Sequence, residues 1–168
     1  MGFRSRIVSI LNMQGHKNIS LGSRVVINYK TRLSAVPLTG MAECNLILND
    51  GCVLGYFNHI YATHEIILGK NVLTADKVYI TDNLHGYEDV NTPVVKQPVK
   101  QIGKVHIGDG AWLGENVCVM GANVGKGSVI GANSVVTKNI PDYCVAVGVP
   151  AKVIKKYNFA TSAWERVN

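Results

Sequence analysis

The sequence lacks any run of about 18 consecutive apolar residues, which is the length that a membrane-spanning helix requires. Its opening stretch, MGFRSRIVSILNMQG, also lacks the long apolar centre and the small-residue cleavage site of a secretory signal peptide. We therefore expect no membrane span and a cytoplasmic location. The apolar and basic residues of the opening stretch predict a short amphipathic helix that packs on the domain.

Cysteine is scarce, and its spacing excludes two common uses. None of the four cysteines lies in a CxxC pair, and no signal peptide precedes them. We therefore expect reduced, mostly buried thiols rather than disulfides or a thiolate metal site. The four residues are Cys44, Cys52, Cys118 and Cys144.

Strong helix formers are few, because Val, Ile, Asn, Gly and Thr outweigh Ala, Glu and Gln. That balance, with 17 glycines spread along the chain, favours strands and turns. A length of 168 residues with 47% hydrophobic residues fits one domain with a core of its own. The formal net charge of +6 indicates an anionic partner, either nucleic acid or a small polyanionic ligand.

An internal repeat dominates the sequence, most clearly in VHIGDGAWLGENVCVMGANVGKGSVIGANSVV, residues 105–136. An aliphatic residue recurs about every six positions, and Gly often follows it. This six-residue repeat is interrupted at about 34–47, 61–67 and 81–104. The residues at the repeated position are Leu21, Ile27, Leu33, Leu48, Leu54, Ile60, Leu68, Thr74, Ile80, Ile107, Leu113, Val119, Val124, Ile130 and Val136.

A six-residue period is a multiple of the two-residue alternation of a strand. Every residue at the repeated position can therefore point to the same, inward side. We expect Gly or Asn beside the aliphatic residue to allow a sharp corner through positive φ. The chain then winds into a solenoid of short parallel strands. A helical reading fails because the aliphatic residues do not recur at three, four and seven positions. A sandwich would need longer strands joined by hairpin turns, which are missing.

The predicted organisation is a single domain over residues 1–168. It consists of an N-terminal segment over 1–18, β-helix coils over 19–149 and a short C-terminal cap over 150–168. A loop over 81–104 protrudes from the coils. Long irregular loops in compact domains are usually functional or disordered, so this loop is the first place to look for a site.

Three motifs together resemble the hexapeptide-repeat acyltransferases: YITDNLHGYED, VHIGDGAWLGENV and VIGANSVVTKNIPDYCVAVGVPAKVIKKY. The chain is most similar to the sugar O-acetyltransferase branch, which includes galactoside and maltose acetyltransferases, and especially to enzymes that modify surface polysaccharides. The resemblance implies a left-handed parallel β-helix and a homotrimer. It also implies acetyl-CoA as co-substrate, bound between neighbouring subunits, and no requirement for a metal.

His85, in the protruding loop, occupies the position of the family's catalytic histidine. A sugar hydroxyl becomes a good nucleophile only as its proton is removed, and imidazole suits that task near neutral pH. No Cys or Ser accompanies His85 in a nucleophile pattern, which favours direct transfer over an acyl-enzyme. A backbone N–H near Glu115 is the expected donor to the tetrahedral oxyanion.

The resemblance also assigns the cofactor contacts. Trp112 is expected to point outward beside the acyl group, and the two lysines of GVPAKVIKKY are expected to meet the phosphates of CoA. A small side chain at position 132 would let the pantetheine arm approach the coil. The predicted cofactor-binding residues are Trp112, Gly114, Glu115, Ala132, Thr137, Lys138, Lys152 and Lys155.

The acceptor side carries weaker signals. Galactoside-type enzymes have an Asn in the coil beneath the catalytic histidine, whereas this sequence has Gly55 there and Asn58 three residues later. Asn58, Asp82 and Tyr87 are the predicted acceptor contacts. The acceptor is expected to be a sugar or glycan precursor rather than nucleic acid.

Three other functions stay open. One is N-acetylation of an amino-sugar nucleotide. Another is a zinc-dependent carbonic anhydrase-like protein, for which His59, His64 and His85 are the candidate ligands, although their spacing does not resemble that family. The third is a solenoid that acts only as an assembly scaffold.

Overall fold

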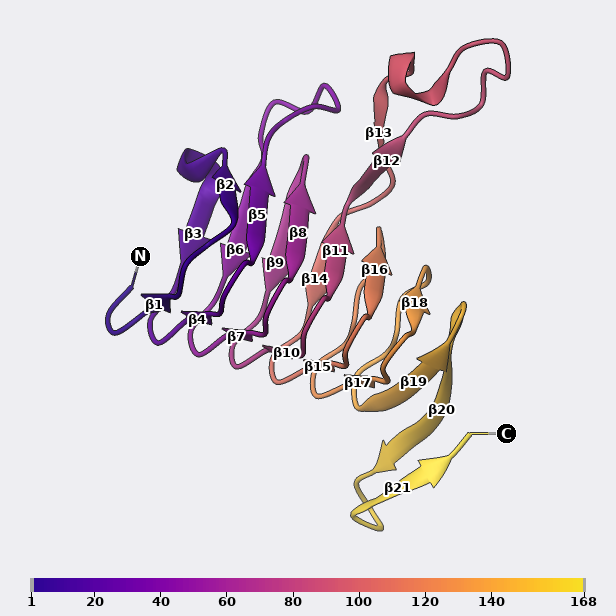
Figure 1. The fold of residues 1–168 in the computed structure, drawn as a ribbon. Coiled ribbons are helices and arrows are strands. Elements are labelled where there is room, and N and C mark those ends of the chain that lie inside the picture. The colour runs from indigo at the N-terminus through magenta and orange to yellow at the C-terminus, as the bar shows by residue number, and fades with distance from the viewer. Residues whose placement is uncertain (1, 168) are drawn as a thin grey trace.

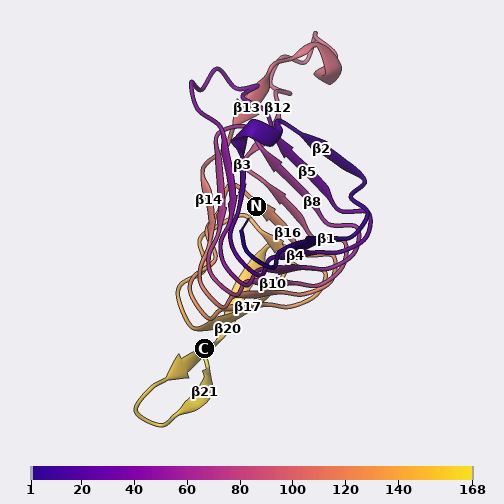
Figure 2. The same ribbon diagram turned by 90° about the vertical axis from the view of Figure 1, so that its left-hand side faces the viewer.

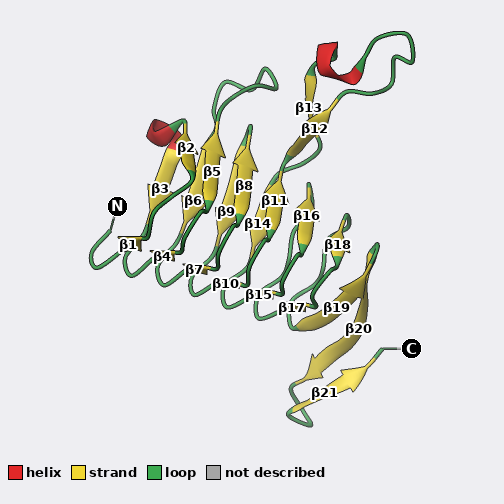
Figure 3. Ribbon diagram, viewed as in Figure 1, coloured by secondary structure: helices red, strands yellow, loops and turns green. Residues whose placement is uncertain are grey.

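In the computed structural model, which describes residues 2–167, short strands wind into a three-sided solenoid (Figure 1). Successive turns stack their strands into three parallel sheets. The helices within residues 2–167 are two 3-10 turns, η1 (His16–Asn18) and η2 (Val94–Lys96) (Figure 3). These features confirm the predicted all-β parallel solenoid.

Sheet 1 has nine strands and forms one side of the solenoid. Its first seven strands pair in parallel, and its last three pair antiparallel with one another. In spatial order they are β1 (Arg6–Ile7), β4 (Val26–Ile27), β7 (Val53–Leu54), β10 (Leu73–Thr74), β15 (Trp112–Leu113), β17 (Val129–Ile130), β19 (Cys144–Gly148), β20 (Ala151–Asn158) and β21 (Ala163–Arg166).

Sheets 2 and 3 form the other two sides. Sheet 2 comprises β2 (Asn12–Gln14), β5 (Arg32–Ala35), β8 (His59–Ala62), β11 (Tyr79–Thr81), β16 (Cys118–Met120) and β18 (Val135–Val136). Sheet 3 comprises β3 (Ile19–Leu21), β6 (Asn45–Leu48), β9 (Glu65–Leu68) and β14 (Val105–Ile107), and the bridges Ile107–Val124 and Val124–Ile140 continue it. A separate antiparallel hairpin joins β12 (Asn83–His85) to β13 (Val99–Gln101).

The core is a stack of ladders in which each inward residue covers its equivalent in the coil before. In sheet 1 the pairing runs Ile27, Leu54, Thr74, Leu113 and Ile130, and all five are at most 2% exposed. The predicted inward positions are confirmed throughout the coils. Leu21 is only partly buried, because its strand is the terminal strand of sheet 3.

The glycines that follow the aliphatic residues have a different role from the predicted one. They do not adopt positive φ; instead, a Cβ at Gly114 would lie 2.7 Å from the backbone nitrogen of Ala132 in the next coil. Positive φ occurs two residues after these glycines, for example at Asn116 (56°) and Asn133 (59°), and also at Phe57 (57°). The repeat therefore selects Gly for close approach of successive coils, whereas the positive-φ position of the turn takes several residue types.

The coils begin earlier than predicted. The opening stretch is not an amphipathic helix, because β1 and β2 lie within it and form the first coil. The predicted interruption at 61–67 is also wrong, since β8 and β9 fill this stretch on either side of a tight corner. At the other end, β20 and β21 form a hairpin that projects beyond the last coil (Figure 1).

Within residues 2–167, no helix is long and apolar enough to cross a membrane.

Candidate active site

His85 lies on the hairpin that leaves the solenoid between sheet 2 and sheet 3, which we call corner 2–3. β12 follows β11 almost directly and pairs antiparallel with β13, so that His85 stands opposite Val99. The backbone N–H of Gly86 donates to the carbonyl of Pro98 (2.8 Å) and extends the pairing past the histidine. His85 is exposed, and its ring has no hydrogen-bond partner among residues 2–167. The imidazole is thus held by a paired strand and is open to solvent.

Asp82 anchors this hairpin to the solenoid. It is 0% exposed, and its carboxylate accepts hydrogen bonds from the backbone N–H groups of Thr63 (2.8 Å), His64 (2.8 Å) and Glu65 (2.9 Å). The Asn83 side-chain amide also donates to it (2.9 Å). A buried carboxylate is stable only when it is satisfied in this way. One side chain therefore closes the corner of one coil and fixes the start of the next coil's hairpin.

Gln101 ties the returning strand of the hairpin to two neighbouring segments. The hydroxyl of Thr63 donates to its side-chain oxygen (3.1 Å), and so does the hydroxyl of Thr39 (3.3 Å) in the loop over 36–44. Gln101 pairs with Asn83, two residues from His85. Sequence reasoning missed Gln101, Thr63 and Thr39, because their role follows from strand register and not from residue type.

A second group of predicted residues lies on the outer face of sheet 1. The strand register places Leu73, Trp112, Val129, Val145 and Lys155 in one row across five successive strands. The neighbours of the first four residues along their strands are buried, so these four side chains point outward, and Lys155 is itself exposed. Trp112 is 48% exposed, as predicted. Strands lie about 4.8 Å apart, so the row from Trp112 to Lys155 is roughly 14 Å long.

Corner 1–2, between sheets 1 and 2, borders this row. It contains Gly114 and Glu115, and Ala132 lies next to them in the following coil. The N–H of Gly114 is used by the coil ladder, but that of Glu115 has no acceptor within residues 2–167. Two coils earlier the equivalent N–H, of Tyr56, donates to Asp76 (2.8 Å). Glu115 thus presents an unused backbone donor at this corner, and its own side chain pairs with Lys77 at the surface (3.4 Å).

Thr137 and Lys138 do not join that group. Both are exposed and follow β18 of sheet 2, so they lie at corner 2–3, two coils beyond the one that carries His85. Lys152 extends the sheet 1 side, because it pairs with Val147 of β19. Seen along the solenoid, the hairpin rises from the corner opposite sheet 1 (Figure 2). One chain therefore holds the predicted site as two separate halves.

Two of the predicted acceptor contacts are not available to an acceptor in this fold. Asn58 is 1% exposed; its amide nitrogen donates to Gly55, Thr74 and Ala75, and its oxygen accepts the N–H of Val78. Asp82 is buried in the anchor already described. Both are corner residues with a structural role. Tyr87, by contrast, is 64% exposed just beyond His85.

The three histidines of the zinc alternative occupy different surroundings. His59 lies on sheet 2 between Tyr61 and Tyr79, with ring centroids 6.1 and 5.1 Å away, and burial and the nearby charge of Arg32 lower its pKa. His64 sits at a corner with Nδ1 3.2 Å from the carbonyl of Glu43. Across residues 2–167, no three His, Cys, Asp or Glu side chains are grouped to hold a metal ion.

The cysteines are free thiols, and three of the four are buried. Desolvation by burial raises the pKa values of Cys44 and Cys52 to about 11. A thiol with so high a pKa is almost entirely protonated near neutral pH, so it is a poor nucleophile. None of the four lies on the hairpin of His85.

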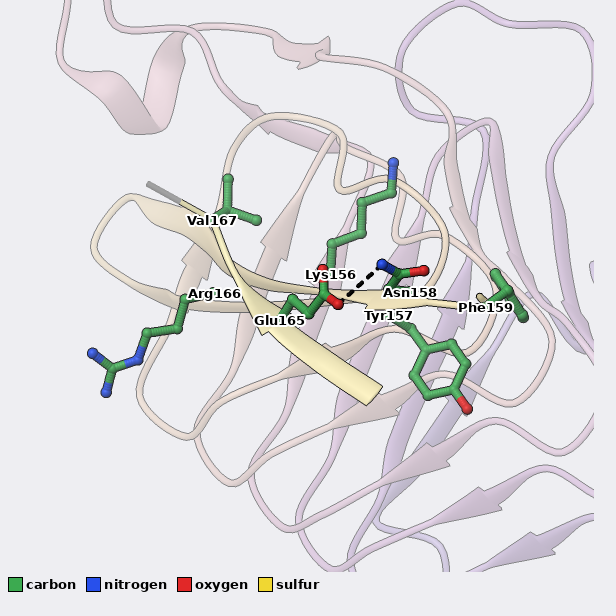
Figure 4. Close-up of a pocket in the computed structure, with 7 residues that line it drawn as sticks. All are labelled: Lys156, Tyr157, Asn158, Phe159, Glu165, Arg166 and Val167. Carbon is green, nitrogen blue, oxygen red and sulfur yellow. Dashed lines mark hydrogen bonds between the residues drawn. The ribbon is translucent and has the colours of Figure 1, made fainter. Parts of the chain in front are cut away.

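A pocket also lies against the C-terminal hairpin of β20 and β21, next to the Lys155 end of the row (Figure 4). The side chain of Asn158 donates to Glu165 across it (2.9 Å). It contains no predicted site residue. Its lining residues are Lys156, Tyr157, Asn158, Phe159, Glu165, Arg166 and Val167.

Sequence comparison finds relatives over most of the coils. A family model described as the hexapeptide repeat of succinyl-transferase matches residues 104–138. The "Putative acetyltransferase YJL218W" of Saccharomyces cerevisiae is 37% identical over 131 residues, which cover 71% of this chain and 67% of that protein. The "Putative lipopolysaccharide biosynthesis O-acetyl transferase WbbJ" of Escherichia coli is 39% identical over 128 residues. These cover 72% of this chain and 65% of that relative, so the chain spans less than two thirds of its length.

Solved structures share the fold at low identity. AntD, an N-acyltransferase from Bacillus cereus in complex with dTDP and 3-hydroxybutyryl-CoA, superposes with a TM-score of 0.73 at 19% identity over 95% of this chain and 86% of that one. PerB from Caulobacter crescentus, in complex with CoA and GDP-perosamine, gives 0.61 at 19% identity over 85% of this chain and 54% of that one. With the repeat model, these likenesses confirm the predicted left-handed β-helix.

Proposed function

This chain belongs to the hexapeptide-repeat acetyltransferase family, and we propose that it transfers the acetyl group of acetyl-CoA to a hydroxyl of a sugar or surface-polysaccharide precursor. The observation that carries the proposal is the exposed His85 on an anchored hairpin, where the repeat is broken and where residues 81–104 contain neither Cys nor Ser. A strand-mounted, solvent-open imidazole is suited to general-base work.

In the proposed reaction, His85 removes the proton of the acceptor hydroxyl while that oxygen attacks the thioester carbonyl. The negative charge that develops on the carbonyl oxygen is stabilised by the unused N–H of Glu115. The C–S bond then breaks, and the proton carried by His85 passes to the departing thiolate. The high pKa values of the buried Cys44 and Cys52 support direct transfer without an acyl-enzyme.

The row on sheet 1 supports the proposed cofactor path. It begins at Trp112, beside the donor N–H at corner 1–2, and ends in the basic side chains of Lys155 and Lys152. The intervening Val129 and Val145 offer an apolar track that suits the pantetheine arm. We place the thioester at Trp112 and the nucleotide phosphates at the lysines, where exposed ammonium groups would act as point charges.

The division into two halves supports a homotrimer in which each site is shared. His85, Thr137 and Lys138 lie at corner 2–3, whereas the row and corner 1–2 lie across the solenoid. A heterologous interface would bring corner 2–3 of one copy against sheet 1 of the next, and a closed ring repeats that contact in every copy. A single chain would leave both halves incomplete.

An amine acceptor is the second candidate. The relative from Escherichia coli is named as an O-acetyl transferase at 39% identity, which favours a hydroxyl. AntD is named as an N-acyltransferase, but its 19% identity argues for the fold alone. His85 could remove a proton from a hydroxyl or from an amine, so a test of acceptors is needed to distinguish O-acetylation from N-acetylation.

Release of free CoA from acetyl-CoA, measured against matched sugars and amino sugars, tests the proposal. We expect turnover with a hydroxyl acceptor and an added acetyl group on oxygen in the product's mass and NMR spectra. Turnover only with the amino sugar would move the assignment to N-acetylation. No turnover with either class, together with no measurable binding of acetyl-CoA, would overturn the enzyme assignment in favour of a scaffold.

A further inference from the structure

The net charge of the chain is unevenly distributed along the solenoid. Residues 1–42 contain six Lys and Arg and not one Asp or Glu, whereas residues 43–168 contain 11 of each kind. Residues 1–42 therefore sum to a charge of +6, and residues 43–168 sum to zero, although their last part, over 150–168, is again basic. These residues form the first coil, β1 to β3, and the start of the second.

The basic residues of this end are available to a partner. Five of them are exposed: Arg4, Arg6, Lys17, Arg24 and Lys30. None of the five takes part in an ion pair within residues 2–167; all the ion pairs found there lie between residues 65 and 115. They surround the terminal coil from several sides, because they come from sheet 1, from η1 and from the corners.

The same end is also apolar. β1, β2 and β3 are the terminal strands of their sheets, so no further coil within residues 2–167 covers them. Phe3 and Leu11 are 73% and 63% exposed there. The inward residues of the first coil are only partly buried, unlike those of the later coils; they are Ile7, Ile10, Met13, Ile19 and Leu21. An apolar centre is thus surrounded by unpaired cations.

The opposite end differs in how its last coil is covered. There β20 turns back along β19 and β21 follows it, so a hairpin covers the last strand of the coils. This hairpin also carries more cations than anions, with Lys152, Lys155, Lys156 and Arg166 against Glu165, and Phe159 and Trp164 are exposed on it. The N-terminal end is distinguished by the lack of any acidic residue over 1–42 and by terminal strands that no hairpin within residues 2–167 covers.

We propose that the N-terminal end of the solenoid docks on the surface of an anionic lipid bilayer, with Phe3 and Leu11 entering the interface and the five exposed cations contacting lipid phosphates. Basic residues near an anionic membrane surface are attracted strongly, and apolar side chains add binding area. Nucleic acid would use the cations but would leave the large exposed aliphatic and aromatic side chains without a partner. The mixed composition therefore favours a bilayer.

Co-sedimentation of the full chain with vesicles tests the proposal independently of any enzymatic activity. Neutral phosphatidylcholine vesicles are compared with vesicles that contain about 30% phosphatidylglycerol, at about 50 mM and about 300 mM NaCl. We expect binding to the anionic vesicles only, and weaker binding at the higher salt concentration. Arg4→Glu/Arg6→Glu should lower the partition coefficient by about tenfold or more. Phe3→Ser/Leu11→Ser should lower it by a smaller factor at both salt concentrations.

Lys70→Glu/Lys126→Glu is the matched control, because it makes the same change of charge at exposed positions in later coils. It should retain binding within about twofold. Equal loss in the control would overturn the proposed location. Lack of binding to anionic vesicles at low salt would overturn the docking itself. Tighter binding to double-stranded DNA or dextran sulfate, unaffected by Phe3→Ser/Leu11→Ser, would replace the bilayer with a polyanion.

Discussion

The hairpin of β12 and β13 and the outer row of sheet 1 carry the two halves of the proposed site in opposite ways. His85 is placed where the repeat is broken, and its position depends on hydrogen bonds specific to that break, centred on Asp82. The row from Trp112 to Lys155 is placed by the repeat itself, one residue for each strand. The hairpin that carries His85 interrupts the repeat, whereas the repeat itself positions the row on sheet 1.

This difference shows what a solenoid can and cannot supply. Its regular spacing provides an extended track for a long ligand, because each coil repeats the same outward position about 4.8 Å further on. It cannot present a lone reactive group above its surface without an insertion. The insertion at corner 2–3 provides this group, but it also separates the base from the track by the width of the solenoid.

Replacement of the proposed base should have the largest effect on activity. We expect His85→Ala to lower kcat by about 10²- to 10⁴-fold, the usual contribution of general-base catalysis. Binding of acetyl-CoA, measured by calorimetry, should persist because the row is untouched. The side chain is exposed, so the melting temperature should barely change.

His59→Ala and His64→Ala are the controls for that variant. Neither residue belongs to either half, so both proteins should keep most of the activity. A folded His85→Ala protein with near-normal kcat would contradict the assigned base. Equal loss in all three variants, with stoichiometric bound zinc, would favour the metal-dependent alternative.

Loss of the hairpin's anchor should have the next largest effect. Asp82→Ala leaves the buried N–H groups of Thr63, His64 and Glu65 without their acceptor, and we expect a stability loss of about 2–4 kcal/mol. A looser hairpin should also lower kcat by about tenfold at temperatures well below the melting point, because misplaced catalytic groups lose rate steeply. KM for acetyl-CoA should be nearly unchanged.

Asp109→Ala provides the comparison from the regular part of the fold. Asp109 is exposed and accepts a single backbone N–H, from Lys70 (2.7 Å), at an ordinary corner. We expect a loss of about 1 kcal/mol or less and no change in kcat. If Asp82→Ala melts early but keeps full kcat, the anchor stabilises the coil without positioning His85.

The smallest effect should come from the far end of the track. Lys152→Ala/Lys155→Ala should raise KM for acetyl-CoA by about threefold to tenfold at low ionic strength and leave kcat near normal. Added salt should reduce the difference in KM between the variant and the wild type, because salt screens exposed charges. An unchanged KM at low salt would show that the two lysines form an ordinary solvated surface.

The coils could be predicted because an even period preserves strand alternation, so Leu54, Leu113 and Ile130 point inward from the pattern alone. The first coil could not, because strands of two or three residues with no regular glycines look like a short helix. The role of Gly114 was mistaken for a local one, whereas the constraint comes from Ala132 in the next coil.

The candidate site was predictable as a set of residues and not as an arrangement. Sequence reasoning named His85, Trp112 and Lys155 without assigning each to a side of the solenoid, although their positions in the repeat contained that information. Asn58 and Asp82 were misread because a polar residue near a site motif looks like a ligand contact. Only the hydrogen bonds of the folded corners reveal that both are buried and fully used.

Subunit mixing tests the shared site most directly. His85→Ala disables one half, and Ala132→Trp, at an exposed position, blocks the track of the other half. Each homotrimer should be inactive, but every mixed trimer contains one junction with two intact halves. Co-refolding equal amounts should therefore restore about a quarter of wild-type activity. If the mixture shows no more activity than the two homotrimers, each site lies within one chain and the account of two complementary halves is contradicted.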